Sequence, residues 1–177
     1  MKKPDKDCYQ HLYDDEDLHY GDAIHNTCPG VKLFPLYSHW LEEPVMDMGC
    51  GRGQVVDLMR KKGWAADGMD QINLHPDMVE GDITKTMLLY MYKSAICIDV
   101  LEHLDDVDCI QVLKNMSATK YQALTVYCGT SHRGKGVELH INIKSPIQWA
   151  EFICRYLAIH EIKNIKGTKQ WLFLTEA

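Results

Sequence analysis

Short apolar runs and longer helical patterns alternate along this chain. Four runs have the length of buried strands, at residues 45–48, 65–69, 94–100 and 121–128. Apolar residues at helical spacing follow the first run over 54–62 and the third run over 107–116. Strands that alternate with helices predict an α/β domain built on a mostly parallel sheet.

The region between the second run and Gly81 differs from the rest of this pattern. Asn73, His75 and Pro76 leave almost no room for a helix there. We therefore expect the second crossover to be trimmed to a loop, and the third strand, near 78–80, to be short.

The two ends of the chain carry further elements. Near-helical spacing of apolar and aromatic residues over 31–41 predicts a segment that leads into the first strand. Ser145 and Gln148 form a capping box at the start of a late helix. The last two runs, 160–165 and 171–175, predict a closing hairpin.

Three glycines follow the first apolar run at alternate positions, in the sequence P-V-M-D-M-G-C-G-R-G from Pro44 to Gly53. Glycine lets a backbone turn tightly and approach a ligand closely. The helix after such a turn directs its unpaired N–H groups at whatever lies there. This strand, turn and helix predict the opening unit of a nucleotide-binding domain.

Composition narrows the class of protein. The chain has 177 residues, which suits one domain, and a formal net charge of -6, which argues against a large nucleic-acid footprint. Seven cysteines without a C-x-x-C pair indicate reduced thiols, so we expect a cytoplasmic protein. No signal peptide or membrane span is visible, and we expect no membrane partner.

Two motifs resemble those of class I S-adenosylmethionine (SAM)-dependent methyltransferases. The segment D-M-G-C-G-R-G from Asp47 resembles the family's first motif, and D-V-L-E-H from Asp99 resembles the motif that follows its fourth strand. The resemblance implies one doubly wound, mostly parallel seven-stranded sheet with an antiparallel last strand. It also implies a SAM-binding domain over 44–177, preceded by an N-terminal cap segment over 1–43. The chain resembles minimal members of the family among phage and bacterial accessory enzymes.

The resemblance also implies where SAM would lie. Asp70 follows the glycines by about 20 residues, where a nucleotide ribose needs an acceptor for its hydroxyls. Asp82 and Ile83 are the implied contacts of the adenine. The turn from Gly49 to Gly51 and the motif from Asp99 to His103 would border the methionine end, with Asp47 orienting that turn. The predicted cofactor-binding residues are Asp47, Gly49, Cys50, Gly51, Asp70, Gln71, Asp82, Ile83, Asp99, Val100, Leu101 and His103.

The expected reaction is an in-line displacement of the methyl group by a small acceptor. His140 is the candidate general base, because the alternation over 138–142 places it on the exposed face of a predicted strand with Glu138 and Asn142. A purely structural role for His140 is the alternative. Glu138, Asn142 and Tyr20 are predicted substrate contacts.

Metal binding is the less favoured hypothesis at two places. Cys8, His11, His25 and Cys28 have donors suited to zinc. Glu102 and His103 could bind a metal together with Asp99. We therefore predict no metal site from the sequence.

Other functions remain open beside the methyltransferase. A SAM-binding partner subunit without transfer activity has the same cofactor motifs. A nicotinamide-dependent oxidoreductase is disfavoured, because Gln54 replaces the last glycine of the dinucleotide fingerprint. The motif from Asp99 has no proline-rich tetrad of the kind that holds a flipped base, which argues against DNA base methylation. We expect a small-molecule, nucleotide or sugar acceptor.

Overall fold

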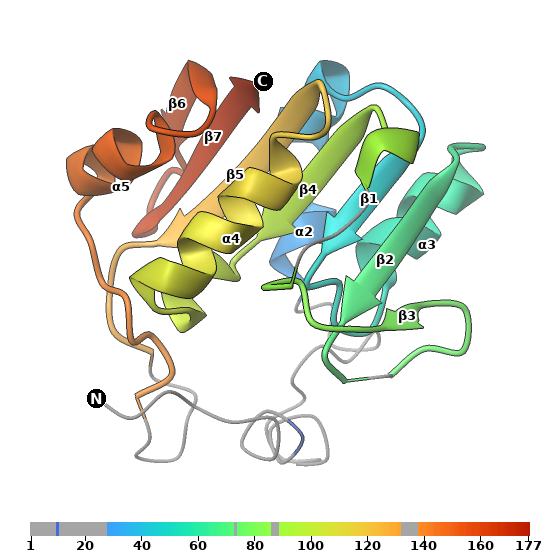
Figure 1. The fold of residues 1–177 in the computed structure, drawn as a ribbon, viewed down its shortest axis with the longest axis horizontal. Coiled ribbons are helices and arrows are strands. Elements are labelled where there is room, and N and C mark those ends of the chain that lie inside the picture. Colours follow the sequence, from blue (N-terminus) through green and yellow to red (C-terminus); the bar gives the residue numbers. More distant parts are fainter. Residues whose placement is uncertain (1–9, 11–27, 73, 86–88, 132–137) are drawn as a thin grey trace.

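A computed structural model describes residues 10, 28–72, 74–85, 89–131 and 138–177 of this chain. A twisted sheet runs through its centre, with helices on both faces (Figure 1). The sheet has seven strands in the order β3-β2-β1-β4-β5-β7-β6. Their bounds are β1 Val45–Met48, β2 Ala66–Asp70, β3 Val79–Glu80, β4 Ser94–Ile98, β5 Tyr121–Tyr127, β6 Ala158–Asn164 and β7 Gln170–Glu176.

Strand directions agree with the predicted fold class. The strands β3, β2, β1, β4 and β5 pair in parallel, and β7 is antiparallel to both β5 and β6. The predicted doubly wound seven-stranded sheet with an antiparallel last strand is therefore confirmed.

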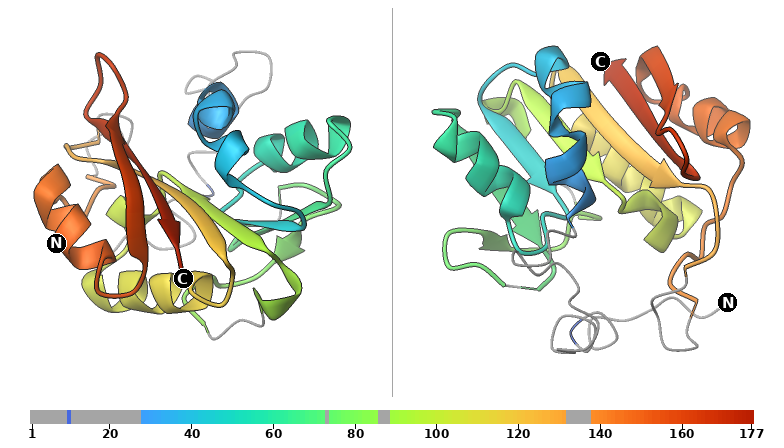
Figure 2. Two further views of the ribbon diagram at one scale, coloured as in Figure 1. Left: turned by 90° about the horizontal axis from the view of Figure 1, so that it is seen from above. Right: turned by 180° about the vertical axis from the view of Figure 1, so that it is seen from behind.

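Helices cover the sheet in two layers (Figure 2). The helices α2 (Pro29–Tyr37) and α3 (Gln54–Lys61) lie on one face, and α4 (Asp106–Met116) and α5 (Pro146–Ile153) lie on the other. Alternate strand residues enter the two cores: Val45 and Ile96 pack with α2 and α3, whereas Met46 and Cys97 pack with α4 and α5. This alternation is the two-residue period of a strand buried on both faces.

Local signals set several helix ends. The Asp105 side chain accepts a hydrogen bond from Asp108 N and so caps α4. Ser145 and Gln148 form the predicted capping box of α5. Gly63, just after α3, has a φ of 84°, a left-handed conformation that favours glycine at a helix end.

The segments 31–41 and 138–142 have different outcomes. The helical spacing over 31–41 corresponds to α2 followed by a short 3-10 helix, η1 (Ser38–Trp40), and the segment leads into β1 as predicted. The alternating segment 138–142 forms no strand, although its residues are described. That prediction was wrong, because alternation indicates a strand only where a neighbouring strand offers backbone partners.

The second crossover is trimmed as predicted. Described residues between β2 and β3 form bends and turns and no helix, and β3 has only two residues. Two further 3-10 helices, η2 (Leu89–Met91) and η3 (Leu101–His103), border β4. Among the described residues, no helix has the length and apolar character needed to cross a membrane.

Candidate active site

The candidate site lies where five parallel strands end. Pairing aligns Met48 of β1 with Met69 of β2, and Ile98 of β4 with Thr125 of β5. The turns that follow these strands therefore gather at one edge of the sheet, which is where ligands bind in open α/β folds. All the predicted cofactor-binding residues lie in or beside these strand ends.

The glycine turn after β1 has the conformation that its sequence requires. Gly49, Gly51 and Gly53 have φ values of 84°, 53° and 69°, which are left-handed. A β-carbon at Gly49 would lie 2.5 Å from Val100 Cγ2. Gly49 therefore also lets the motif after β1 contact the motif after β4.

Asp70 joins the first two turns at this edge. Its Oδ2 accepts a hydrogen bond from Gly51 N at 2.9 Å, and its Oδ1 accepts one from Ile72 N at 3.1 Å. The carboxylate is thus fixed beside the glycine turn, at the predicted ribose position. The neighbouring Gln71 is exposed.

Asp47 is a buried acid within β1, with 2% of its surface exposed. Burial, with a smaller contribution from the nearby charge of Asp70, raises the pKa of Asp47 to about 8. Burial, followed by the charge of Asp47, also raises the pKa of the Cys50 thiol, so Cys50 is not a reactive thiolate. A cationic ligand near this edge would favour the ionised form of Asp47.

The loop after β3 is ordered by its own side chains and by α4. Asp82 Oδ1 accepts hydrogen bonds from Thr84 N at 2.9 Å and from Thr84 Oγ1 at 2.6 Å. Asn115 of α4 donates from Nδ2 to the carbonyl oxygens of Ile83, at 2.9 Å, and Lys85, at 2.6 Å. The predicted adenine contacts Asp82 and Ile83 are therefore held in one backbone conformation.

Asp99 follows β4 with a φ of 55°, a left-handed conformation that is uncommon outside glycine. Thr125 Oγ1 donates to its Oδ1 at 2.7 Å, and Gln170 Nε2 lies 2.7 Å from both carboxylate oxygens. Burial raises the pKa of Asp99, while the Thr125 and Gln170 hydrogen bonds oppose that rise. Thr125 and Gln170 are not among the residues predicted from sequence. A polar residue within an apolar strand run was the available signal at Thr125.

Two residues of the motif after Asp99 have different surroundings. Val100 contacts the glycine turn, as described above. Leu101 has a fully buried side chain within the core that holds α4 and α5. A contact between Leu101 and the cofactor could therefore come only from its backbone.

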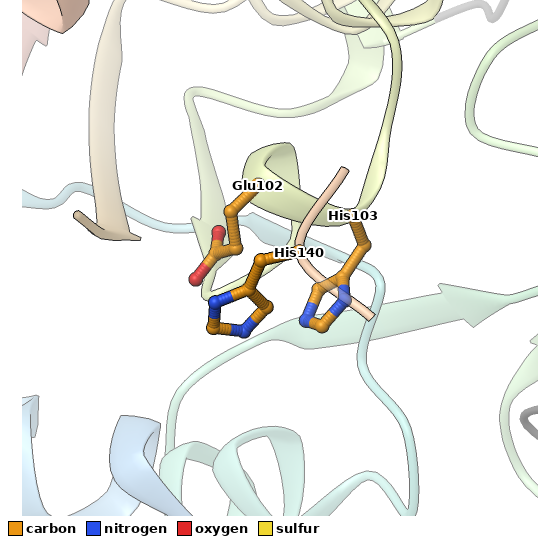
Figure 3. Close-up of side chains that lie close together, drawn as sticks. All are labelled: Glu102, His103 and His140. Carbon is orange, nitrogen blue, oxygen red and sulfur yellow. The ribbon is translucent and has the colours of Figure 1, made fainter. Parts of the chain in front are cut away.

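Glu102, His103 and His140 lie close together at this edge (Figure 3). One potential ligand atom from each lies within 4.8 Å of those of the other two. Burial, followed by the charge of His140, lowers the pKa of His103 to about 4. Burial also raises the pKa of Glu102 well above its usual range.

The predicted substrate residues Glu138 and Asn142 have different hydrogen-bond partners in the structure. Glu138 Oε1 accepts hydrogen bonds from Ser131 N at 2.7 Å and from His140 N at 2.8 Å, so Glu138 positions His140. Asn142 is 8% exposed, and its amide bonds Asp106 at 2.9 Å as well as Lys144. This arrangement favours a structural role for Asn142 over a substrate contact.

Several predicted ligands cannot be compared with the structure. Tyr20 lies outside the described residues, as do Cys8, His11 and His25 of the possible zinc set. Cys28 is described and immediately precedes α2.

Comparison with known proteins identifies the fold of this chain. No family model matches the sequence, and no curated protein matches it significantly. A 1,6-didemethyltoxoflavin-N1-methyltransferase from Burkholderia thailandensis, solved with 1,6-didemethyltoxoflavin and S-adenosylhomocysteine, is 14% identical and has a TM-score of 0.71, with 95% of this chain and 84% of that chain covered. The chain has the class I methyltransferase fold.

Two other methyltransferases show the same fold along their whole length. Magnesium protoporphyrin IX methyltransferase from Synechocystis PCC 6803, solved with bound SAM, is 11% identical with a TM-score of 0.66, and 100% of both chains is covered. A SAM-dependent methyltransferase from Clostridium acetobutylicum ATCC 824 is 12% identical with a TM-score of 0.65, and 96% of this chain and 98% of that chain are covered. At these identities the likeness shows the class I methyltransferase fold alone.

The hydrogen-bond acceptors at the carboxyl edge of this class I fold suit SAM chemically. A fixed carboxylate, Asp70, fits ribose hydroxyls, and a second, Asp82, can accept from an amino group. The buried Asp47 makes the edge more compatible with a cationic ligand than with a pyrophosphate.

Proposed function

We propose that this protein is a SAM-dependent methyltransferase that acts on a small-molecule, nucleotide or sugar acceptor. The observation that carries the proposal is the position of Asp70. It ends the second strand and is hydrogen-bonded to the glycine turn after the first. That is where a nucleotide ribose lies against an α/β sheet, and the acids on either side favour a ligand with a positive end.

Each part of the carboxyl edge has one role in this proposal. The turn from Gly49 to Gly51 would accommodate the methionine end, and Asp47 would orient that turn. Asp70 would accept hydrogen bonds from the ribose hydroxyls, while Asp82 and Ile83 would contact the adenine. SAM, when bound, supplies a methyl group on a sulfonium that leaves as a neutral thioether. The protein contributes mainly alignment and exclusion of water.

His140 is the candidate general base for an acceptor proton. Its Nδ1 lies 2.6 Å from Gly129 O, and its backbone N–H is held by Glu138. If Nδ1 donates to that carbonyl, the lone pair of Nε2 can accept a proton. The ring also lies near that of Tyr127, with centroids 5.4 Å apart, so two aromatic side chains would border the acceptor.

Calorimetric titration with SAM, S-adenosylhomocysteine and NAD tests the proposed cofactor. We expect SAM and its demethylated product to bind, and NAD not to bind. Asp70→Ala should weaken SAM binding at least about tenfold, equivalent to roughly 1.4 kcal/mol. The exposed Asp77, on the loop before β3, provides the control variant Asp77→Ala, which should bind SAM normally.

Two results would contradict this proposal. Unchanged SAM affinity in a folded Asp70→Ala variant would remove the ribose assignment. NAD binding in place of SAM would support the oxidoreductase instead. A screen of metabolites with methyl-labelled SAM then separates an active enzyme from a SAM-binding partner subunit, because only the enzyme transfers label.

A further inference from the structure

The cluster of Glu102, His103 and His140 combines residues from two distant parts of the chain. Glu102 and His103 belong to η3 after β4, whereas His140 lies in the segment after β5. The two imidazole rings are nearly perpendicular, with centroids 4.8 Å apart (Figure 3). Two imidazoles and one carboxylate are a donor set found in metal sites.

Both histidines are oriented by backbone carbonyls. His103 Nδ1 lies 3.1 Å from Leu139 O, and His140 Nδ1 lies 2.6 Å from Gly129 O. In the tautomer that donates from Nδ1, each ring has its lone pair on Nε2. Metal-binding histidines are typically oriented in this way, by a second ring nitrogen that donates to a carbonyl or carboxylate.

The burial of the Glu102 carboxylate is a second observation that points to a bound cation, beside the orientation of the two histidines. Its side chain is fully buried, and Oε1 accepts a hydrogen bond from Tyr127 N at 2.9 Å. Its other oxygen, Oε2, is buried and has no hydrogen-bond partner among the described residues. A buried carboxylate oxygen without a partner is costly, and a bound cation would compensate that cost.

We propose that Glu102, His103 and His140 bind one divalent transition-metal ion. The two imidazole donors favour Zn²⁺, Fe²⁺ or Co²⁺ over Ca²⁺ and Mg²⁺, which prefer oxygen ligands, and the carboxylate also suits Mn²⁺. Ligand atoms around one tetrahedral ion lie roughly 3.4 Å apart, so the side chains would draw together by about 1 Å. Three protein ligands leave at least one coordination position for water or another oxygen donor.

The position of this ion suggests a role, which depends on the proposed function above. His140 is close enough to Asp99 for its charge to affect the pKa of that residue, and Asp99 begins the motif expected at the methionine end. The open coordination position would then hold an acceptor oxygen near the methyl group. In that case the Nε2 lone pair of His140 binds the metal, and His140 is not the general base.

Metal titration of the full chain tests the site without any methyl transfer. The protein is dialysed against EDTA, and Zn²⁺, Mn²⁺ and Co²⁺ are then titrated by calorimetry in the absence of SAM. We expect one ion per chain at this cluster, with Co²⁺ giving a visible absorption spectrum. Glu102→Gln and His140→Ala should each weaken binding at least about 100-fold, because each removes a direct ligand.

The variants are chosen so that folding and ligation can be separated. Glu102→Gln keeps a carbonyl oxygen for the Tyr127 N–H, and circular dichroism checks that each variant folds. His39→Ala, at an exposed histidine of η1, is the matched control and should bind metal normally. Metal affinity that survives in folded Glu102→Gln and His140→Ala would overturn the proposal.

Two further outcomes have a defined meaning. If His25→Ala rather than His140→Ala abolishes binding, the N-terminal cysteine and histidine set binds the ion and the proposal is wrong. SAM is titrated separately in EDTA, since its binding tests the methyltransferase and not the metal site. Metal binding without SAM binding would support this site while contradicting the proposed function.

Discussion

Asp47→Asn should stabilise the unliganded protein, and increasingly so as the pH rises. In the folded protein, burial and the charge of Asp70 raise the pKa of Asp47 from 3.8 to about 8. The unfolded carboxyl group ionises near its ordinary value, so between about pH 4 and pH 8 the folded state binds the additional proton. The contribution of Asp47 to the free energy of unfolding therefore falls as pH rises through this window, and it levels off above the folded pKa.

The size of this effect follows from the shift. Four pKa units correspond to an upper limit of roughly 5.4 kcal/mol, because each unit is worth about 1.36 kcal/mol. A neutral asparagine of similar shape has no such dependence. The stability gained by Asp47→Asn should therefore rise by more than about 1 kcal/mol between pH 5 and pH 8.

Urea unfolding of both proteins at pH 5, 6, 7 and 8 measures this difference directly. Asp99 and Glu102 are present in both proteins, so their own contributions cancel. Asp77→Asn, at an exposed acid, is the control and should change stability little at any pH. A difference between Asp47→Asn and wild type that does not grow with pH would refute the reasoning.

Two further predictions concern the turns at the carboxyl edge. Gly49→Ala should destabilise the protein by clearly more than Gly63→Ala in thermal unfolding. Both glycines have a φ of 84°, but a β-carbon at position 49 would lie 2.5 Å from Val100 Cγ2, whereas one at position 63 would have no neighbour within 4 Å. Equal losses of stability would contradict this prediction. Gln170→Ala should cost about 1–3 kcal/mol in urea unfolding, because it removes the amide that donates to the half-buried Asp99 carboxylate. No change in stability would show that this contact contributes nothing.

Local features of this fold could be predicted from sequence. The strand 45–48 has the predicted bounds, and the capping box of Ser145 and Gln148 starts α5 as expected. Such features depend on residues within one turn of each other. The glycine turn is local in the same sense, because glycine is the residue that adopts a left-handed φ without steric cost, and Gly49, Gly51 and Gly53 all do so.

Features that depend on the packing of distant segments could not be predicted. Gln170 reaches Asp99 only because β7 pairs antiparallel with β5 in one register, which places Gln170 opposite Tyr127. His140 meets Glu102 and His103 through a segment that lacks the predicted strand. In both cases the sequence shows which groups are present but not which of them meet.

A crystal structure of this protein with S-adenosylhomocysteine tests the central claim most directly. We predict that the ligand lies across the ends of the first four strands, with its ribose hydroxyls hydrogen-bonded to Asp70, its adenine beside Ile83 and its amino acid part against the turn from Gly49 to Gly51. S-adenosylhomocysteine bound elsewhere, an edge that stays empty at saturating ligand, or NAD bound at this edge in a second crystal would contradict the account.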